Sequence, residues 1–166
     1  MGFTMNPTPW PPEPIAILLL DVDGTLTDGG LYYSAEGLAM KRFDVRDGLG
    51  IVLLQQAGVE VAVVSADDSP VTAARCRKLG IRQAEIGCAD KAERVRQILA
   101  ARGLRPGQAC YMGDDLTDLP AFAVGVHAVA PADAVGEVRA AAEYVTSALA
   151  GHGAVREVCD LLRAAL

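Results

Sequence analysis

The stretch that most constrains the fold of this chain runs from Ile15 to Asp28 and reads IAILLLDVDGTLTD. Its first six residues are all apolar, a pattern typical of a strand that is buried on both faces in a parallel sheet. The apolar run ends abruptly in two carboxylates, Asp21 and Asp23, which Gly24 follows. Because open α/β sheets bind their ligands at the carboxyl ends of their strands, these two acids are the first candidate site residues.

Apolar runs suited to strands alternate with helical patterns along the rest of the chain. We expect further strands over 59–64, 83–86, 109–112, 124–129 and 144–146, and helices over 47–57, 69–79, 91–102, 116–123 and 153–166. Such an alternation predicts a parallel sheet that helices cover on both faces, with right-handed crossovers. The expected fold is therefore a three-layer α/β/α, Rossmann-like domain.

Two segments fall outside this alternation. Runs over 31–33 and 39–44 flank a turn that contains Gly37, which predicts a β-hairpin inserted after the first strand. The hairpin is too short to bury its own apolar side chains, so we expect it to pack on another surface such as a second subunit. Residues 1–14 hold five of the nine prolines and are expected to form a flexible tail with a solvated Trp10, ahead of one domain over 15–166.

Charge and cysteine usage exclude several classes of partner. The formal net charge is −6 without any basic block, which argues against nucleic acid and against an anionic membrane as partners. No apolar run approaches the roughly 20 residues of a membrane span. The four cysteines are far apart and lack the spacing of metal ligands. They indicate a reduced, cytoplasmic protein.

Polar residues follow several of the expected strands and begin one helix: Asp21, Asp23, Ser65, Lys91, Asp114 and Asp115. Because the carboxyl ends of parallel strands lie along one edge of a sheet, we expect these side chains to converge. Clustered carboxylates repel one another unless a cation lies among them. All-oxygen ligands favour a hard metal, and Mg²⁺ suits a site that shares its ligands with a phosphate group.

This set of groups is suited to phosphoryl transfer. One carboxylate can attack phosphorus and form an acyl phosphate. A second carboxylate, two residues further on, can protonate the leaving oxygen and then activate water. Mg²⁺ and a lysine offset the charge on the phosphoryl oxygens, while a hydroxyl and backbone N–H groups at a strand end hold another oxygen.

The motifs D-x-D-G-T at 21–25 and G-D-D-x-x-D at 113–118, together with Ser65 and Lys91, resemble those of the haloacid dehalogenase superfamily of phosphatases. The resemblance implies that Asp21 is the nucleophile and Asp23 the general acid/base. It implies that Asp21, Asp114 and the backbone carbonyl of Asp23 bind Mg²⁺.

The same resemblance assigns further roles around that centre. Lys91 would bridge the nucleophile and the phosphate, and Ser65 would belong to the catalytic set. Asp115 and Asp118 would lie in or near the layer of residues behind the metal ligands. Thr25 and Ala66 would contact the substrate.

Only about forty residues separate the aspartate pair from Ser65, which leaves no room for a cap domain. Among capless members, the segments 21–33, 43–51, 113–118 and 151–162 resemble the 3-deoxy-D-manno-octulosonate 8-phosphate phosphatases. That resemblance implies a phosphorylated ulosonic acid substrate, a place in lipopolysaccharide biosynthesis and a homotetramer joined through the hairpin. It also makes Arg46 and Arg156 candidates for contacting the substrate, with a salt bridge between subunits as the alternative.

One position departs from that family. The usual Gly-Arg after the second strand is Ala66-Asp67 here. We expect an anion beside an anionic substrate to weaken binding, which leaves a nine-carbon ulosonic acid 9-phosphate open as substrate. A weakly active oligomeric or regulatory homologue is a further alternative. A receiver-type phosphoacceptor domain also uses strand-end aspartates and Mg²⁺, but it requires an aspartate on the third strand, where 83–87 has none.

Overall fold

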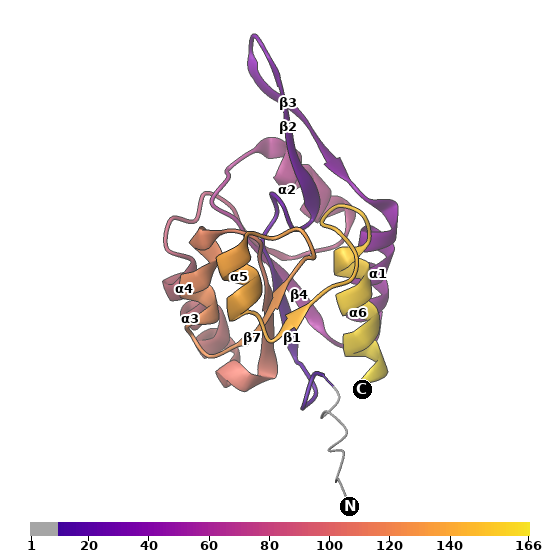
Figure 1. The fold of residues 1–166 in the computed structure, drawn as a ribbon, viewed down its shortest axis with the longest axis vertical. Helices are drawn as coiled ribbons and strands as arrows, with labels where there is room; N and C mark the ends of the chain where they lie inside the picture. Colours follow the sequence, from indigo (N-terminus) through magenta and orange to yellow (C-terminus); the bar gives the residue numbers. More distant parts are fainter. Residues whose placement is uncertain (1–9) are drawn as a thin grey trace, which may run out of the picture.

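The computed structural model describes residues 10–166, and β1 lies at the centre of its main sheet (Figure 1). Six strands pair in parallel in the order β5-β4-β1-β6-β7-β8. Their bounds are Ile17–Leu20 (β1), Glu60–Val64 (β4), Gln83–Glu85 (β5), Ala109–Met112 (β6), His127–Ala130 (β7) and Tyr144–Val145 (β8). The predicted parallel sheet is confirmed.

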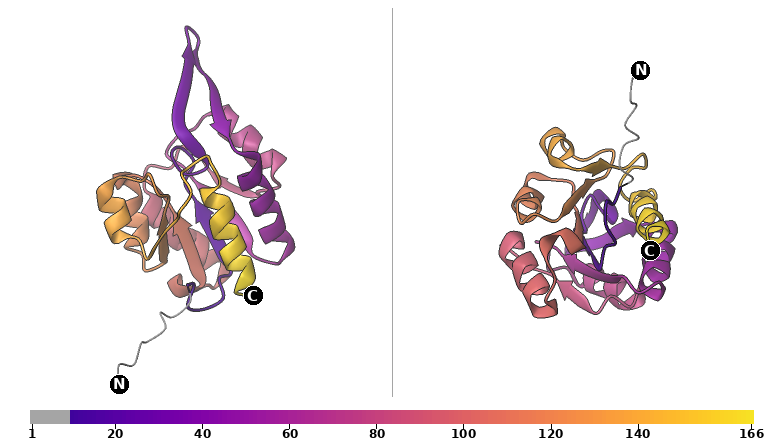
Figure 2. Two further views of the ribbon diagram at one scale, coloured as in Figure 1. Left: turned by 45° about the vertical axis from the view of Figure 1, so that its right-hand side comes forward. Right: turned by 90° about the horizontal axis from the view of Figure 1, so that it is seen from below.

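Helices cover both faces of this sheet, as expected for three layers. One face packs on α1 (Val45–Gln56), α2 (Pro70–Lys78) and α6 (Ala154–Ala164), and the other on α3 (Lys91–Arg102), α4 (Leu119–Phe122) and α5 (Gly136–Ala141). Along β1, Leu18 and Leu20 point into the first core while Ile17 and Leu19 point into the second. Figure 2 shows α6 lying beside α1.

Local capping explains where two of the predicted helices begin. Ser69 accepts a hydrogen bond from the amide of Val71 at the start of α2, and Asp90 accepts one from Glu93 at the start of α3. The predicted helix over 116–123 is a 3-10 turn, Leu116–Asp118, followed by the short α4. The sequence did not predict α5, because six residues are too few for a helical period to be recognised.

The hairpin consists of β2 (Thr27–Ser34) and β3 (Gly37–Phe43), which pair antiparallel and project away from the main sheet (Figure 1). Asp28-Gly29-Gly30, a sequence typical of a turn, belongs to β2 instead. The pairing is irregular between Thr27 and Leu31, so the glycines there produce a bulge instead of a turn. Large apolar side chains lie exposed on the hairpin at Leu31, Tyr32, Tyr33 and Met40.

The described part of the amino-terminal segment packs on the domain. The ring of Trp10 stacks on that of Tyr144 with centroids 4.9 Å apart, and it contacts the core between β1 and α6. The expectation of a solvated Trp10 is therefore wrong, because Tyr144 offers an aromatic face. The rest of the predicted tail, 1–9, lies outside the described residues. Across 10–166 no helix is both long and apolar enough to span a membrane.

Candidate active site

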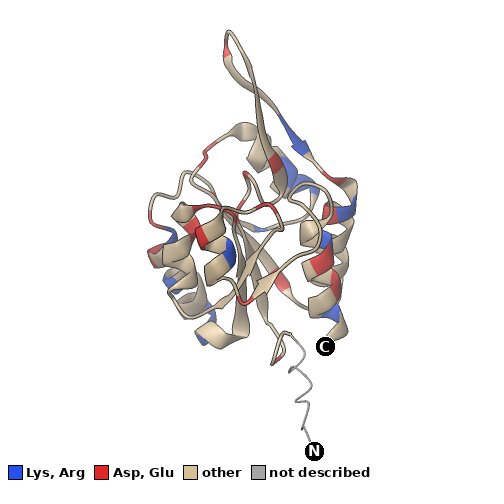
Figure 3. Cartoon of the chain, in the orientation of Figure 1, with Lys and Arg blue, Asp and Glu red and all other residues tan. Residues whose placement is uncertain are grey.

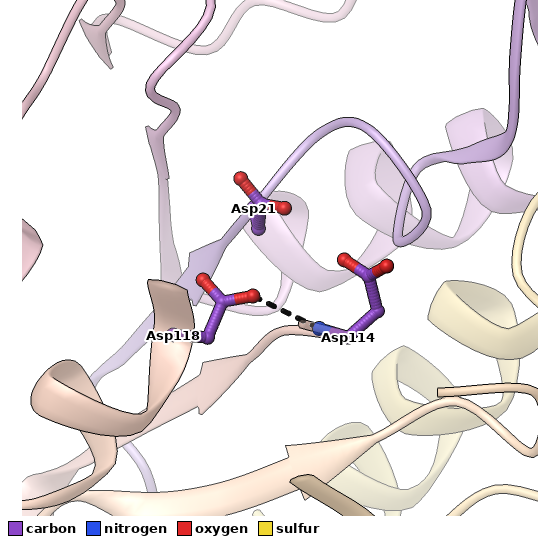
Figure 4. A group of neighbouring side chains, drawn as sticks. All are labelled: Asp21, Asp114 and Asp118. Carbon is purple, nitrogen blue, oxygen red and sulfur yellow. Dashed lines mark hydrogen bonds between the residues drawn. The ribbon is translucent and has the colours of Figure 1, made fainter. Parts of the chain in front are cut away.

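The carboxyl ends of β1 and β6 bring the predicted aspartates together. The two strands are neighbours, and the amide of Asp21 donates a hydrogen bond to the carbonyl of Met112 at 3.0 Å. Asp21, Asp114 and Asp118 each offer a carboxylate oxygen within 4.8 Å of the others. Figure 4 shows these three side chains gathered at the strand ends.

Lys91 joins two of these carboxylates. Its Nζ lies 2.8 Å from Oδ1 of Asp21 and 2.7 Å from Oδ1 of Asp118, and its side chain is buried. Lys91 is the first residue of α3, so the helix start that Asp90 caps places it at the sheet edge. Lys91, expected to bridge Asp21 and the phosphate, contacts Asp21, and its contact with phosphate stays a prediction.

Asp118 is held by both of its carboxylate oxygens. Its Oδ1 accepts hydrogen bonds from Lys91 and from the hydroxyl of Tyr111 at 2.8 Å. Its Oδ2 accepts hydrogen bonds from the amides of Asp114 at 3.0 Å and Asp115 at 3.2 Å. Asp118 therefore positions both Lys91 and the backbone that carries Asp114. Asp115 is exposed, and its own carboxylate accepts a hydrogen bond from the amide of Leu116.

The electrostatics of the cluster favour a bound cation. Burial raises the pKa of Asp114 to about 8, and the neighbouring carboxylates of Asp21 and Asp118 add to this shift. Burial likewise raises the pKa of Asp21 to about 6, with Asp118 raising it further and Lys91 opposing both effects. A cation among these oxygens would relieve the repulsion. The all-oxygen donor set therefore fits Mg²⁺.

Gly24 gives Asp114 the space that this arrangement requires. A Cβ atom at Gly24 would overlap Oδ2 of Asp114, and the φ angle of Gly24 is +83°. Only glycine combines that backbone conformation with so close an approach. Thr25 is fully buried beside it, with Oγ1 3.4 Å from Oδ1 of Asp114. The G-T part of the motif therefore packs against the proposed metal ligand.

Ser65 and Ala66 follow β4 at the same edge of the sheet. Ser65 is buried, and its hydroxyl accepts a hydrogen bond from the amide of Asp67 at 3.3 Å. Ala66 is exposed, as a residue that approaches a ligand through its backbone would be. Their roles toward phosphate stay predictions.

Asp23 lies apart from the three clustered carboxylates and pairs with a different lysine. Nζ of Lys41, on β3, lies 2.8 Å from Oδ1 and 2.9 Å from Oδ2 of Asp23. The same Nζ lies 2.7 Å from Oδ2 of Asp67. Asp67, expected to leave an unpaired anion beside the substrate, is therefore ion-paired within the chain, and it shares this one cation with Asp23.

The two predicted substrate arginines are engaged elsewhere. Arg46 donates to Oδ1 and Oδ2 of Asp44 and to the carbonyl of His152, and its side chain is largely exposed. Arg156 pairs with Asp160 at 2.7 Å, one turn along α6. No contact joins either arginine to the aspartate cluster among residues 10–166. Their substrate roles stay predictions.

Comparison with known proteins places this geometry in a family, although no family model matches the chain. The chain is 43% identical over 150 residues to 3-deoxy-D-manno-octulosonate 8-phosphate phosphatase KdsC of Haemophilus influenzae. The matched residues cover 90% of this chain and 83% of that protein. It is 40% identical to KdsC of Escherichia coli K12 over 90% of this chain and 80% of the relative. The chain belongs to the 3-deoxy-D-manno-octulosonate 8-phosphate phosphatase family.

Solved structures of this phosphatase family have the same fold. The cobalt-bound enzyme of Haemophilus influenzae superposes with a TM-score of 0.88 over 91% of this chain and 88% of that chain, at 43% identity. The Moraxella catarrhalis enzyme, in complex with a magnesium ion, a phosphate ion and KDO, gives a TM-score of 0.87 at 35% identity, over 91% of this chain and 87% of its own. The predicted capless phosphatase fold is confirmed.

Sequence reasoning about this family member missed Lys41. The residue lies in a hairpin strand between Met40 and Arg42, where nothing local distinguishes a buried lysine from a solvated one. The one available signal was Asp67 itself, because an anion where the resemblance implies an arginine is stabilised by a nearby cation.

Proposed function

We propose that this protein is a Mg²⁺-dependent phosphatase that hydrolyses 3-deoxy-D-manno-octulosonate 8-phosphate through an aspartyl-phosphate intermediate. The observation that carries the proposal is the contact of Lys91 with Asp21, next to Asp114, at the carboxyl end of β1. Membership of the phosphatase family supports the same assignment.

In the proposed reaction, Asp21 attacks the phosphorus of the substrate. The new bond joins a carboxylate oxygen of Asp21 to phosphorus, the bond to the sugar oxygen breaks, and Asp23 gives its proton to that oxygen. Asp23 then takes a proton from water, which attacks phosphorus, releases phosphate and restores Asp21. Lys91 holds Asp21 in place and offsets charge on the phosphoryl group.

The metal would be held by the carboxylates of Asp21 and Asp114 and by the backbone carbonyl of Asp23. When bound, Mg²⁺ offsets the negative charge on the phosphoryl oxygens. Asp118 accepts hydrogen bonds from the amides of Asp114 and Asp115, so it fixes the loop that presents Asp114. Asp115 supports this loop from its exposed side.

The choice of the eight-carbon substrate follows the named activity of the relatives and the pairing of Asp67. Because Asp67 is ion-paired with Lys41, the exchange of arginine for aspartate does not leave an isolated anion beside an anionic sugar acid. The nine-carbon ulosonic acid 9-phosphate remains the comparison substrate.

We further propose that the protein is a cytoplasmic homotetramer in lipopolysaccharide biosynthesis. The apolar side chains exposed on the hairpin support association through that element. Four free cysteines are consistent with a reducing compartment.

The test is phosphate release with and without Mg²⁺, over eight-carbon and nine-carbon phosphorylated sugar acids. We expect the eight-carbon compound to be preferred, chelation to abolish release, and Asp21→Asn to lower kcat by at least about 10³-fold. Glu137→Gln, which removes an exposed carboxylate on α5, serves as the matched control. Unchanged turnover by Asp21→Asn would exclude the mechanism. A folded wild-type protein that hydrolyses none of these compounds would favour the regulatory homologue.

A further inference from the structure

A buried ammonium group lies at the base of the hairpin, outside the set of residues assigned above. The side chain of Lys41 is fully buried, although the neighbouring Met40 and Arg42 are exposed. Figure 3 shows positive residues on the part of β3 nearest the body of the molecule, whereas the tip of the hairpin carries a negative one. Lys41 therefore points inward, toward the edge of the main sheet where the site lies.

Three acceptors from different parts of the chain surround this ammonium. They are a carboxylate oxygen of Asp23, Oδ2 of Asp67 at 2.7 Å and Oγ1 of Thr72 at 3.2 Å. An ammonium group has three N–H donors, so every donor has an acceptor. Burial alone would lower the pKa of Lys41, but its hydrogen bonds to Asp23 and Asp67 raise the pKa overall. Lys41 is therefore a fully bonded cation.

Asp67 is held by the same cluster, with its side chain 30% exposed. Its Oδ2 accepts hydrogen bonds from Lys41, from the amide of Ser69 at 3.0 Å and from the hydroxyl of Thr72. Burial raises the pKa of Asp67, but these hydrogen bonds leave it below its ordinary value. The loop after β4 and the first turn of α2 therefore supply fixed anchors for the lysine.

Both carboxylate oxygens of Asp23 lie against the ammonium of Lys41, with Oδ1 at 2.8 Å and Oδ2 at 2.9 Å from Nζ. A carboxylate held through both oxygens by one fixed cation has a defined direction. A defined direction is what a general acid requires if it is to meet the leaving oxygen of a substrate.

We propose that Lys41 is a positioning residue that aims the carboxylate of Asp23 at the leaving oxygen, and that Asp67 and Thr72 hold Lys41 in turn. This inference rests on the proposed function, because it assigns Asp23 the role of general acid/base. It gives Asp67 a use inside the site that an arginine could not serve, since a guanidinium has no acceptor for the N–H groups of a lysine. It also makes the base of the hairpin part of the catalytic apparatus.

The test uses the dependence of kcat/KM on the leaving group, with Lys41→Met as variant and Lys78→Met, an exposed lysine at the end of α2, as control. The substrates are 3-deoxy-D-manno-octulosonate 8-phosphate and p-nitrophenyl phosphate. An alkoxide needs a proton as it leaves and p-nitrophenolate does not. We expect Lys41→Met to lower kcat/KM by about 10- to 100-fold for the sugar phosphate and by less than about 3-fold for the aryl phosphate.

A double-mutant cycle separates positioning from a general structural role. If Lys41 acts through Asp23, then Lys41→Met should cost less than about 2-fold for the sugar phosphate once Asp23→Asn is present. Asp67→Asn keeps the shape of the side chain but removes its charge. It should lower kcat/KM for the sugar phosphate by about 3- to 10-fold and leave kcat/KM for the aryl phosphate nearly unchanged. This variant provides a second readout if Lys41→Met does not fold.

Equal losses on both substrates, or additive losses in the cycle, would overturn the positioning role while leaving the proposed phosphatase intact. A folded wild-type protein that hydrolyses neither compound would overturn the proposed function, and the role of Lys41 with it.

Discussion

At the scale of single residues, the site is defined by how its carboxylates are paired. Asp21 has Lys91, Asp23 has Lys41, and Asp118 receives four hydrogen bonds. Among residues 10–166, the carboxylate of Asp114 has no cation beside it and accepts a long hydrogen bond from the hydroxyl of Thr25 at 3.4 Å. Of the two carboxylates proposed to bind the metal, Asp114 is therefore the one whose charge is least offset within the chain, so a bound cation should stabilise it more than Asp21.

This imbalance predicts how stability depends on pH without metal. Because the pKa of Asp114 is about 8 in the folded protein and 3.8 for an ordinary solvated aspartate, the folded state binds the proton more tightly than the unfolded state. Stability should therefore fall as the pH rises from about 4 to about 8, with Asp21 and Asp114 titrating together. Asp114→Asn should remove part of this loss of stability. We expect the free energy of unfolding at pH 8.5 in EDTA to rise by about 1–2 kcal/mol, which corresponds to a rise in Tm of roughly 2–6 °C.

The measurement is Tm against pH in EDTA and in Mg²⁺. Wild type and Asp114→Asn should have similar Tm values near pH 3, where the carboxyl is mostly protonated in both states. Mg²⁺ should raise the Tm of wild type at pH 8 more than that of the variant. A wild-type Tm that rises steadily with pH in EDTA would contradict this interpretation of the cluster.

At the scale of elements, short loops at the carboxyl ends of strands depend on single side chains for their shape. Glu157, in the first turn of α6, accepts hydrogen bonds from the hydroxyl of Tyr144 at 2.8 Å and from the amides of Ser147 and Ala148, each at 3.0 Å. It ties the segment after β8 to the helix. That segment leads to Gly151, which packs on the backbone of Thr27 and Asp28 at the start of the hairpin.

Replacing Glu157 should loosen this connection. Glu157→Ala removes an acceptor for two amides and a hydroxyl, so we expect a loss of about 1–3 kcal/mol in the free energy of unfolding. Chemical denaturation monitored by circular dichroism measures this loss. Glu93→Ala, an exposed glutamate in the first turn of α3, is the control, with an expected change within about 0.5 kcal/mol. Equal losses in the two variants would show that the hydrogen bonds of Glu157 do not stabilise the segment after β8.

At the scale of the whole molecule, the hairpin is the part that the domain does not bury. Its base is attached through Lys41 to the sheet edge, while its outer half carries exposed Tyr32, Tyr33 and Met40 (Figure 1). Tyr32 and Met40 are cross-strand partners, so they form one apolar patch. An isolated apolar hairpin of this kind is suited to association with another copy of the chain.

Charges placed in this patch should disrupt the proposed tetramer. We expect the double variant Tyr32→Asp and Met40→Asp to elute as a smaller species than wild type in size-exclusion chromatography with light scattering. Burying two carboxylates at an apolar interface costs several kcal/mol. Ala100→Asp, on the exposed face of α3, should leave the mass unchanged. A wild-type protein that is already monomeric at micromolar concentration would refute the tetramer.

Much of the architecture could be predicted from local patterns. Apolar runs indicate buried strands, and Ser69-Pro70 and Asp90 are typical of helix starts. Acids at the ends of strands indicate the carboxyl edge of a parallel sheet. These signals were enough to place Asp21 and Asp114 together, because parallel topology brings all such ends to one edge, whereas the role of Lys91 rested on the family resemblance.

The sequence by itself determined the sheet, its site edge and the chemistry of the clustered acids, since each depends on residues close together in the chain or on topology alone. Only the tertiary structure decided which cation meets which anion. Lys41 reaches Asp23 and Asp67 across 18 and 26 residues, and Arg46 and Arg156 pair with Asp44 and Asp160. A side chain's partner depends on where distant backbone segments pack, and a lysine in a strand carries no local mark of the face to which it will point.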